Sequence, residues 1–290
     1  ALGIISETAS SKMGELGTTT FRPPYTPLTF GTIVGRNVGK YFDIIRKTPI
    51  HEWHIENKAE FENVGQWKRA WYYPQNGENM HEAVQRESKA ARDSAGILDA
   101  STLGKIDIQG TDASEFLNRV YTNAWSKLEI GKCRYGLMLN EDGMVYDDGV
   151  TTRLDENHYI MTTTTGGAAT VLGKLEDYLQ TEWPELDVYL TSVTDHYATI
   201  SVCGPNSKKI IQKVIPEIDL SDKDFPHMSF KNSKIGKVKC RVMRISFTGE
   251  QSYEINIQAN YAKSVWENCM EAGKEFNITP YGTETMHLLR

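Results

Sequence analysis

Hydrophobic and polar residues alternate clearly between residues 133 and 153, and the alternation is interrupted once, at Asn140-Glu-Asp-Gly143. Alternation with a period of two predicts strands, and Asn and Asp ahead of a glycine favour a tight turn. Gly143 is free to take the positive φ that such a turn needs. We therefore predict a β-hairpin in this segment.

The second strand of this hairpin carries two adjacent aspartates, which must point to opposite faces. By the period of two, Asp148 lies on the face that we expect to be buried, and Asp147 points the other way. The same face carries Met144, Tyr146 and Val150. A carboxylate among apolar side chains is costly unless something binds it. Asp148 is then either a structural aspartate bonded to hairpin backbone or an ionised carboxylate that holds or polarises an amine.

The rest of the pattern predicts a mixture of strands and helices. Helices are expected from a capping-box-like start at Asn79 to Gly96, over 112–121, after Gly166-Gly167, over 207–214, after Asn260, and over 283–290. Strands are expected over 105–109, 159–165, 197–203, 238–246 and 252–258. Strands and helices without strict alternation indicate an α+β fold with antiparallel sheets.

Three regions follow from this pattern. Residues 1–40 are rich in Ser, Thr, Gly and Pro and are expected to form a linker or extended arm. Residues 41–185 and 186–290 are expected to form two subdomains. Aromatic residues are dense over 41–78, which suggests a segment packed on a larger body. Both ends look cut, since there is no initiator Met and the last residues predict a helix without a C-cap.

Composition narrows the class of protein. The chain is 39% hydrophobic and 24% charged, as soluble globular proteins are. A net charge of −6 argues against non-specific nucleic-acid binding, and no apolar run is long enough for a membrane span. The four cysteines are scattered, without a C-x-x-C pair, which favours buried free thiols in a reducing cytoplasm over a metal site. The histidines lack metal-binding spacing, and His51-Glu-Trp-His54 is expected to be a packed aromatic segment.

For two further features, the sequence is compatible with two interpretations each. Glu254 lies on the strand face opposite Tyr253 and Ile255, so it is either a solvated glutamate or an acceptor for the flat amidine-like edge of a guanine or pterin ring. Gly166-Gly167 forms either a tight strand-to-helix turn or a helix N-terminus that meets an anion.

Four segments, taken in chain order, resemble the folate-binding family of the glycine-cleavage T-protein, or aminomethyltransferase. These segments are Ile97–Lys105, Tyr135–Asp148, Val202–Pro205 and Phe247–Ile255. Three more segments are similar to the branch of that family found in the alpha subunits of heterotetrameric sarcosine oxidases. These are Val64–Pro74, Tyr121–Leu139 and Thr181–His196. The resemblance covers about residues 22 to 290.

The resemblance implies roles for individual residues. It places the catalytic Asp148 beside the reactive nitrogen of tetrahydrofolate, Glu254 on the pterin, and Tyr135 in the folate pocket. Phe247 falls where family members often have Tyr, and Thr164 falls near a pocket Asn. A folate-binding Arg of T-proteins falls near Met286 and is not carried over.

The resemblance also implies a T-protein-like α+β fold with two mixed or antiparallel sheet domains, without the carboxyl-terminal barrel domain. It implies the folate-binding part of a sarcosine oxidase alpha subunit, which captures the one-carbon unit of sarcosine as 5,10-methylene-tetrahydrofolate. Tetrahydrofolate is the expected cofactor. Flavin and NAD are expected only on absent regions or on partner subunits, including a flavin-bearing beta subunit. The alternatives are a folate-binding assembly or scaffold module without catalysis, or part of a dimethylglycine oxidase-type enzyme.

Overall fold

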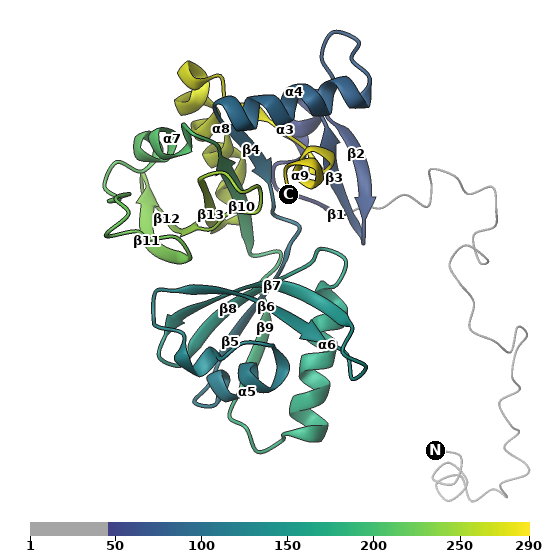
Figure 1. Ribbon diagram of the computed structural model, residues 1–290, viewed down its shortest axis with the longest axis vertical. Helices are drawn as coiled ribbons and strands as arrows, with labels where there is room; N and C mark the ends of the chain where they lie inside the picture. The colour runs from purple at the N-terminus through teal and green to yellow at the C-terminus, as the bar shows by residue number, and fades with distance from the viewer. Residues whose placement is uncertain (1–45) are drawn as a thin grey trace, which may run out of the picture. The chain divides into compact units, whose positions relative to one another are not determined.

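The computed structural model describes residues 46–290, so the expected arm over 1–40 lies outside the described residues. In the described part of the chain, the strands form sheets of three, six and five strands (Figure 1). The pairs β1–β3 and β14–β4 are parallel, and the larger sheets are otherwise antiparallel. The predicted α+β class with largely antiparallel sheets is confirmed.

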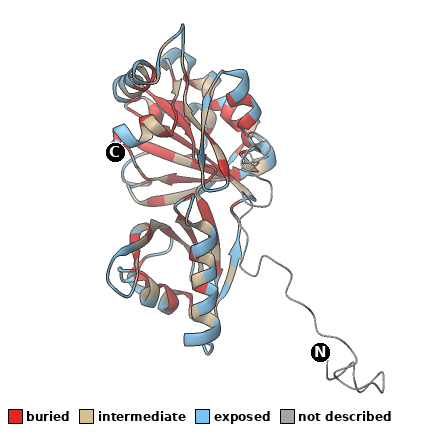
Figure 2. Ribbon diagram, turned by 90° about the vertical axis from the view of Figure 1, so that its right-hand side faces the viewer, coloured by how far each residue is buried: buried red, intermediate tan, exposed pale blue. Residues whose placement is uncertain are grey.

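The six-stranded sheet has the order β11-β12-β13-β10-β4-β14. Its strands are β4 Gly96–Asp99, β10 Tyr197–Cys203, β11 Ser229–Ile235, β12 Val238–Arg244, β13 Ser252–Gln258 and β14 Thr279–Pro280. Helices α7 (Ser207–Val214) and α8 (Ala262–Gly273) contact it. Alternate residues Tyr253, Ile255 and Ile257 are fully buried in the core on one face. Figure 2 shows this core as red stretches of the central strands.

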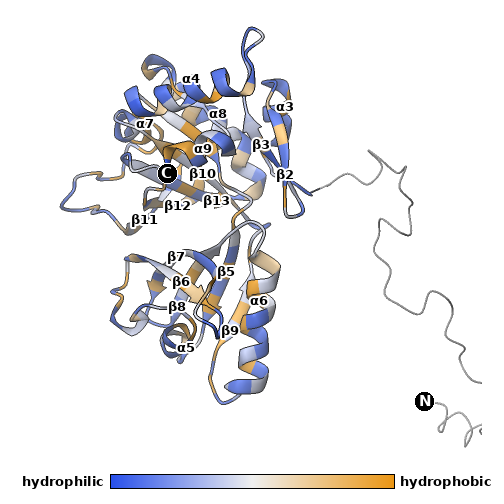
Figure 3. Ribbon diagram, turned by 45° about the vertical axis from the view of Figure 1, so that its right-hand side comes forward, coloured by the Kyte–Doolittle hydropathy of each residue, from blue (hydrophilic) through white to orange (hydrophobic). Residues whose placement is uncertain are grey.

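The five-stranded sheet has the order β6-β7-β8-β5-β9. Its strands are β5 Gly104–Gln109, β6 Cys133–Leu139, β7 Val145–Asp155, β8 His158–Thr163 and β9 Tyr189–Ser192. Helices α5 (Ala113–Val120) and α6 (Ala168–Asp177) bury Phe116, Leu117 and Leu175 in its core. Figure 3 shows the mixed hydrophobic and hydrophilic residues of α6, as expected of an amphipathic helix. Short helical turns complete the described chain: Trp125–Lys127, Tyr178–Glu182, Ala259–Tyr261 and Lys274–Phe276.

The aromatic segment packs on the larger body, as predicted. It forms β1 (Arg46–Lys47), α3 (His51–Glu56), β2 (Glu60–Val64) and β3 (Trp67–Tyr72). Trp53 contacts Trp266 of α8 with ring centroids 5.1 Å apart. His54 bonds to Asp99 at 3.0 Å and to the Tyr73 hydroxyl at 2.9 Å. Burial raises the pKa of Asp99, but the hydrogen bond and charge of His54, together with further hydrogen bonds such as that from Ser101, bring that pKa to about 2.

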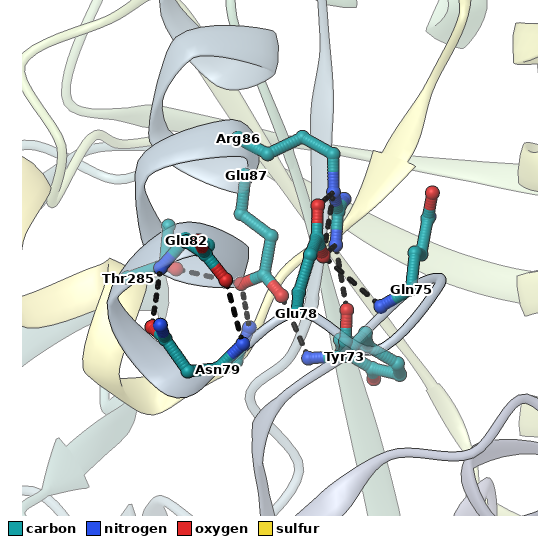
Figure 4. Close-up of polar contacts among 9 residues, drawn as sticks. Tyr73, Gln75, Glu78, Asn79, Glu82, Arg86, Glu87 and Thr285 are labelled. Atoms are coloured by element: carbon teal, nitrogen blue, oxygen red, sulfur yellow. Dashed lines mark hydrogen bonds and ion pairs between the residues drawn. The ribbon is translucent and has the colours of Figure 1, made fainter.

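Helix α4 (Met80–Asp93) begins at the predicted capping box, in which Asn79 and Glu82 bond reciprocally (Figure 4). The helix ends before Gly96, which instead starts β4. A Cβ at Gly96 would lie 2.8 Å from the Tyr281 ring, so this glycine allows close packing and does not stop a helix. The predicted terminal helix is α9 (Thr283–Leu289). The α8 helix starts at Ala262 with Tyr261 as its N-cap, and not at the expected cap Asn260.

Strand pairing crosses the expected division at residue 185, between β4 and β10, between β4 and β14, and between β5 and β9. β4 precedes it and pairs with β10, while β9 follows it and pairs with β5. The division into 41–185 and 186–290 stays a prediction, and the sheets interleave segments from both sides of it.

Candidate functional site

The hairpin forms as predicted, but a bulge changes which aspartate is buried. Met138 pairs with Asp147 and Leu139 pairs with Val145, so Tyr146 is an extra residue in β7. An extra residue shifts the facing of everything on one side of it. Asp147 is therefore the buried carboxylate, 3% exposed, and Met144 is 65% exposed. The expectation that Asp148 lies on a buried face with Met144 and Tyr146 was wrong.

Asp147 is held by the turn that opens α6. The Thr164 hydroxyl donates to it at 2.6 Å, and the Thr164 amide donates at 3.3 Å. A Cβ at Gly167 would lie 2.5 Å from an Asp147 oxygen, so a glycine is needed there. Burial raises the pKa of Asp147. Gly166-Gly167 therefore forms the tight strand-to-helix turn that was one of its two predicted roles. The anionic group next to this turn is the carboxylate of Asp147.

Asp148 lies on the other face of β7, where it bonds to Tyr135 of β6. The Tyr135 hydroxyl donates to Asp148 Oδ2 at 2.7 Å. Tyr135 is 46% exposed, so the pair is accessible. Partial desolvation and then the bond to the negative Asp148 raise the pKa of the Tyr135 phenol, and Arg290 opposes this rise. The pair presents a carboxylate whose position is fixed by one hydrogen bond and which can accept more.

Glu254 is partly exposed, and within the described residues its carboxylate has no hydrogen-bond or ion-pair partner. It lies on β13, opposite the buried Tyr253 face as predicted, and its neighbours across the strands are Ser201 and Met243. Burial raises the pKa of Glu254 to about 7, although Lys105 lowers it. In the part of the chain that the structure describes, no hydrogen bond or ion pair to its carboxylate is found. It can therefore accept a matching pair of donors.

Phe247 lies in the loop after β12 and is 44% exposed. The Arg290 guanidinium carbon lies 5.2 Å from the centre of its ring. Arg92 of α4 anchors this loop to the end of α9, since it donates to the Thr248 carbonyl at 2.7 Å and to the Leu289 carbonyl at 2.8 Å. The positive charge of Arg290 also lowers the pKa of the Tyr135 phenol, so Arg290 lies over the Phe247 ring and acts electrostatically on Tyr135.

The two larger sheets meet beside these residues. Thr152 of β7 donates to Met243 of β12 at 3.9 Å, and Met243 pairs with Glu254 in the sheet. Cys133 lies two residues before Tyr135, and the negative charge of Glu254 contributes to the raised pKa of its thiol. Of the five predicted site residues, Tyr135 and Asp148 are in direct contact. Met243 lies between Glu254, its strand partner, and Thr152 of the other sheet. Thr164 bonds to Asp147 and not to Asp148.

A cavity lies away from these residues. It has a volume of about 690 Å³ and is lined by polar residues of β10 to β13 such as Asn232, Arg241 and Asn256. None of the five predicted residues lines it. Among residues 46–290, no cluster of metal-binding side chains is present, and no helix has the length and apolarity that a membrane crossing requires.

Two residues of the site were not predicted from the sequence. Lys105 lies next to two alternating isoleucines, on what the pattern presents as a polar face, and Arg290 is the last residue. No local pattern marks either one, because each acquires its role from a segment distant in the chain.

Comparison with known families gives a match to the GCVT N-terminal domain over residues 50–290. The chain is 54% identical over its whole length to the sarcosine oxidase subunit alpha of Corynebacterium sp. (strain P-1), of which it covers 30%. It is 30% identical to an aminomethyltransferase of Caldanaerobacter subterraneus subsp. tengcongensis, with 86% of the chain and 63% of that protein covered. The chain thus spans less than a third of the length of the sarcosine oxidase relative.

The fold is similar to the crystal structure of glycine cleavage system aminomethyltransferase T from Bartonella henselae. The TM-score is 0.72 at 22% identity, covering 85% of this chain and 62% of that chain. The predicted T-protein-like fold and the resemblance to sarcosine oxidase alpha subunits are confirmed.

Proposed function

The chain belongs to the GCVT N-terminal domain family, and from that premise we propose that it binds tetrahydrofolate as part of a sarcosine oxidase alpha-type polypeptide. Its role there is to capture the one-carbon unit of sarcosine as 5,10-methylene-tetrahydrofolate. The observation that carries the proposal is an accessible carboxylate, Asp148, fixed by the Tyr135 hydroxyl at 2.7 Å.

The donor and acceptor groups of this chain fit a reduced folate. Glu254 is partly exposed and has no partner among the described residues, so its carboxylate complements two adjacent N–H donors such as those of a pterin ring. The exposed side chains of Tyr135 and Phe247 can line an aromatic ligand. Bound tetrahydrofolate would supply the amine that accepts the one-carbon unit.

Asp148 acts through the negative charge of its carboxylate. Its carboxylate orients the amine that it faces and stabilises positive charge that develops as a C–N bond forms. Tyr135 holds Asp148 by donating to one oxygen, which leaves the other oxygen free to accept from ligand. Phe247 cannot supply a hydroxyl contact. Thr164 contributes indirectly by fixing the adjacent Asp147.

The similarity to sarcosine oxidase alpha subunits also suggests which other subunits the protein assembles with. We propose that the redox step takes place on a partner subunit with flavin, because the chain is similar to the alpha subunits of sarcosine oxidases. The partner would deliver an iminium or formaldehyde equivalent to the site at Asp148.

The test is Asp148→Asn in the full-length, assembled protein. Methylene-folate formed from sarcosine is measured alongside folate affinity by calorimetry. We expect the yield of methylene-folate to fall about a hundredfold, while the dissociation constant changes less than about tenfold. Asp142→Asn in the exposed hairpin turn is the matched control and should leave both unchanged.

Two outcomes would contradict the proposal. An unchanged yield with intact folate binding would remove Asp148 from catalysis and favour a binding or scaffold module. A wild-type protein that does not bind tetrahydrofolate would refute the proposed ligand.

A further inference from the structure

The cavity on the six-stranded sheet, with a volume of about 690 Å³, is lined by more positive than negative groups. Its cations are Lys234 of β11 and Lys239 and Arg241 of β12. Among the described residues that line it, Glu217 is the single carboxylate. Lys234 pairs directly with Lys239 in the β11–β12 hairpin, and Arg241 lies on the same face two residues further along β12 (Figure 1). Like charges directly opposite each other destabilise an antiparallel pair, so this concentration of charge does not serve stability.

Arg241 lines the cavity without an acceptor for its donors. Its Nε atom is buried and has no hydrogen-bond partner. In the described part of the chain its guanidinium takes part in no hydrogen bond or ion pair, and its carbon lies 5.6 Å from the centre of the Phe230 ring. The carboxylate of Asp107 acts on Arg241 at longer range, but it is already bonded to His158 at 2.6 Å and to Gln109 at 2.7 Å. A buried guanidinium is unfavourable unless a ligand supplies the missing acceptor.

Asn256 of β13 adds a neutral donor beside Arg241. The two residues pair across β12 and β13, and Asn256 is 6% exposed. Its side-chain oxygen accepts from the Thr199 hydroxyl at 2.8 Å, which leaves the amide hydrogens as the free groups. Asn232 pairs with Arg241 on the other side, so the three side chains form a row across the sheet. The cavity therefore has donors at its buried side and two exposed ammonium groups at its outer side.

We propose that this cavity binds a small organic anion with at least two negative charges, carried on carboxylate or phosphate groups. A planar guanidinium matches both groups, because each presents two oxygens to its parallel N–H donors. The two lysines add charge with little geometric demand. A volume of about 690 Å³ lies within the range of small-molecule sites. Because the Arg241 Nε and Asn256 are buried, the ligand must enter the cavity, which suits a small molecule better than the surface of an acidic protein.

The inference does not rest on folate binding, because none of the five residues of the proposed folate site lines the cavity. It concerns a second ligand, held on the six-stranded sheet by charge and by hydrogen-bond donors.

The experiment measures binding of citrate and of inorganic pyrophosphate to the full-length protein by calorimetry at low ionic strength. Citrate carries carboxylates and pyrophosphate carries phosphates, so the two probes distinguish the two sources of negative charge. We expect one site with a dissociation constant below about 1 mM for at least one probe. Acetate carries a single charge and should bind at least about tenfold more weakly than the better probe.

Four variants assign the binding to the cavity. Arg241→Met removes the guanidinium and should weaken binding about tenfold or more, while Arg241→Lys keeps the charge and should fall between the Met variant and the wild type. Lys239→Met should weaken binding severalfold. It should also raise the melting temperature of the free protein, because it removes one of two opposed like charges. Lys237→Met, in the exposed turn of the same hairpin and outside the cavity lining, is the matched control and should leave binding unchanged.

Binding of neither probe overturns the inference. Equal weakening by Lys239→Met and Lys237→Met also overturns it, since that result indicates non-specific attraction to a positive hairpin. Binding that Arg241→Met leaves unchanged is a third contrary result, and if this variant does not fold, Arg241→Lys and the exposed Lys239→Met decide the question. A protein that binds a probe but not tetrahydrofolate supports this site and refutes the proposed function, so the two failures are distinguishable.

Discussion

At the scale of single residues, the hairpin shows how far a periodic pattern can be trusted. The pattern placed two aspartates on opposite faces, and they are on opposite faces. It assigned the buried face to Asp148, whereas Asp147 is buried, because the bulge at Tyr146 resets the period. A bulge depends on how β6 pairs with β7, which no count of residues along one strand reveals.

The adjacent aspartates should respond differently to the same substitution. Asp147→Ala leaves the Thr164 amide and hydroxyl without their acceptor, at a cost of about 1–3 kcal/mol, so the turn before α6 should open more easily. Asp148→Ala removes a partly exposed group with a single hydrogen bond and should have little effect there. Amide hydrogen exchange at Thr164 and Gly167 measures both. Equal protection in the two variants would show that Asp147 does not hold the turn.

At the scale of elements, long regular segments were predicted best. The structure reproduces the predicted bounds of α7 and β13, because an amphipathic helix and an alternating strand carry their own signal. β11, with the sequence Ser-Phe-Lys-Asn-Ser-Lys-Ile, was not predicted, because a polar edge strand is defined by its partner β12. β4 has four residues, too few to show a period.

Contacts between elements depend on Glu87, which the sequence did not single out. Glu87 of α4 is fully buried and accepts from the Tyr73 amide at 2.7 Å, the Gly282 amide at 3.1 Å and the Thr285 hydroxyl at 2.6 Å (Figure 4). It therefore joins α4 to the end of β3 and to the start of α9.

Glu87→Ala should release these elements from each other. Three buried donors lose their acceptor, and we expect a local destabilisation of about 3–5 kcal/mol. Hydrogen exchange at the Tyr73 and Gly282 amides should rise accordingly. Glu82→Ala removes only the exposed capping bond of the same helix and should cost about 1 kcal/mol. If Glu87→Ala leaves exchange at Tyr73 unchanged, the carboxylate is not what joins α4 to β3.

At the scale of the whole molecule, the sheets are assembled from segments far apart in the sequence. β4 pairs with β10 about a hundred residues later, and β5 pairs with β9. The Tyr135–Asp148 pair and Glu254 consequently lie on different sheets, which come together through contacts such as Thr152 with Met243. The site therefore depends on the packing of both sheets and not on one motif.

The reactivity of the four cysteines depends on how tightly the sheets pack. All four are free and buried, as predicted, and burial raises the pKa of Cys133 and Cys269 to about 12 and that of Cys240 to about 11. In the native protein, alkylation by iodoacetamide at pH 8 should be about a hundredfold slower than in denaturant, since the thiolate is the nucleophile. Peptide mapping by mass spectrometry assigns the rates. Fast labelling of Cys133 would mean that the sheets separate readily beside the site.

The sequence by itself determined the class of fold, most helices and strands, the hairpin, the free thiols and the family. Each of these depends on local periodicity, on composition or on a contiguous motif, which can be recognised without knowing the tertiary contacts. Only the tertiary structure decided which hairpin aspartate is buried, that the partly exposed Glu254 has no partner among the described residues, and that Lys105 is buried. Burial and charge at a residue are set by what packs on it, and the groups that pack on Glu254 and Asp148 come from distant strands.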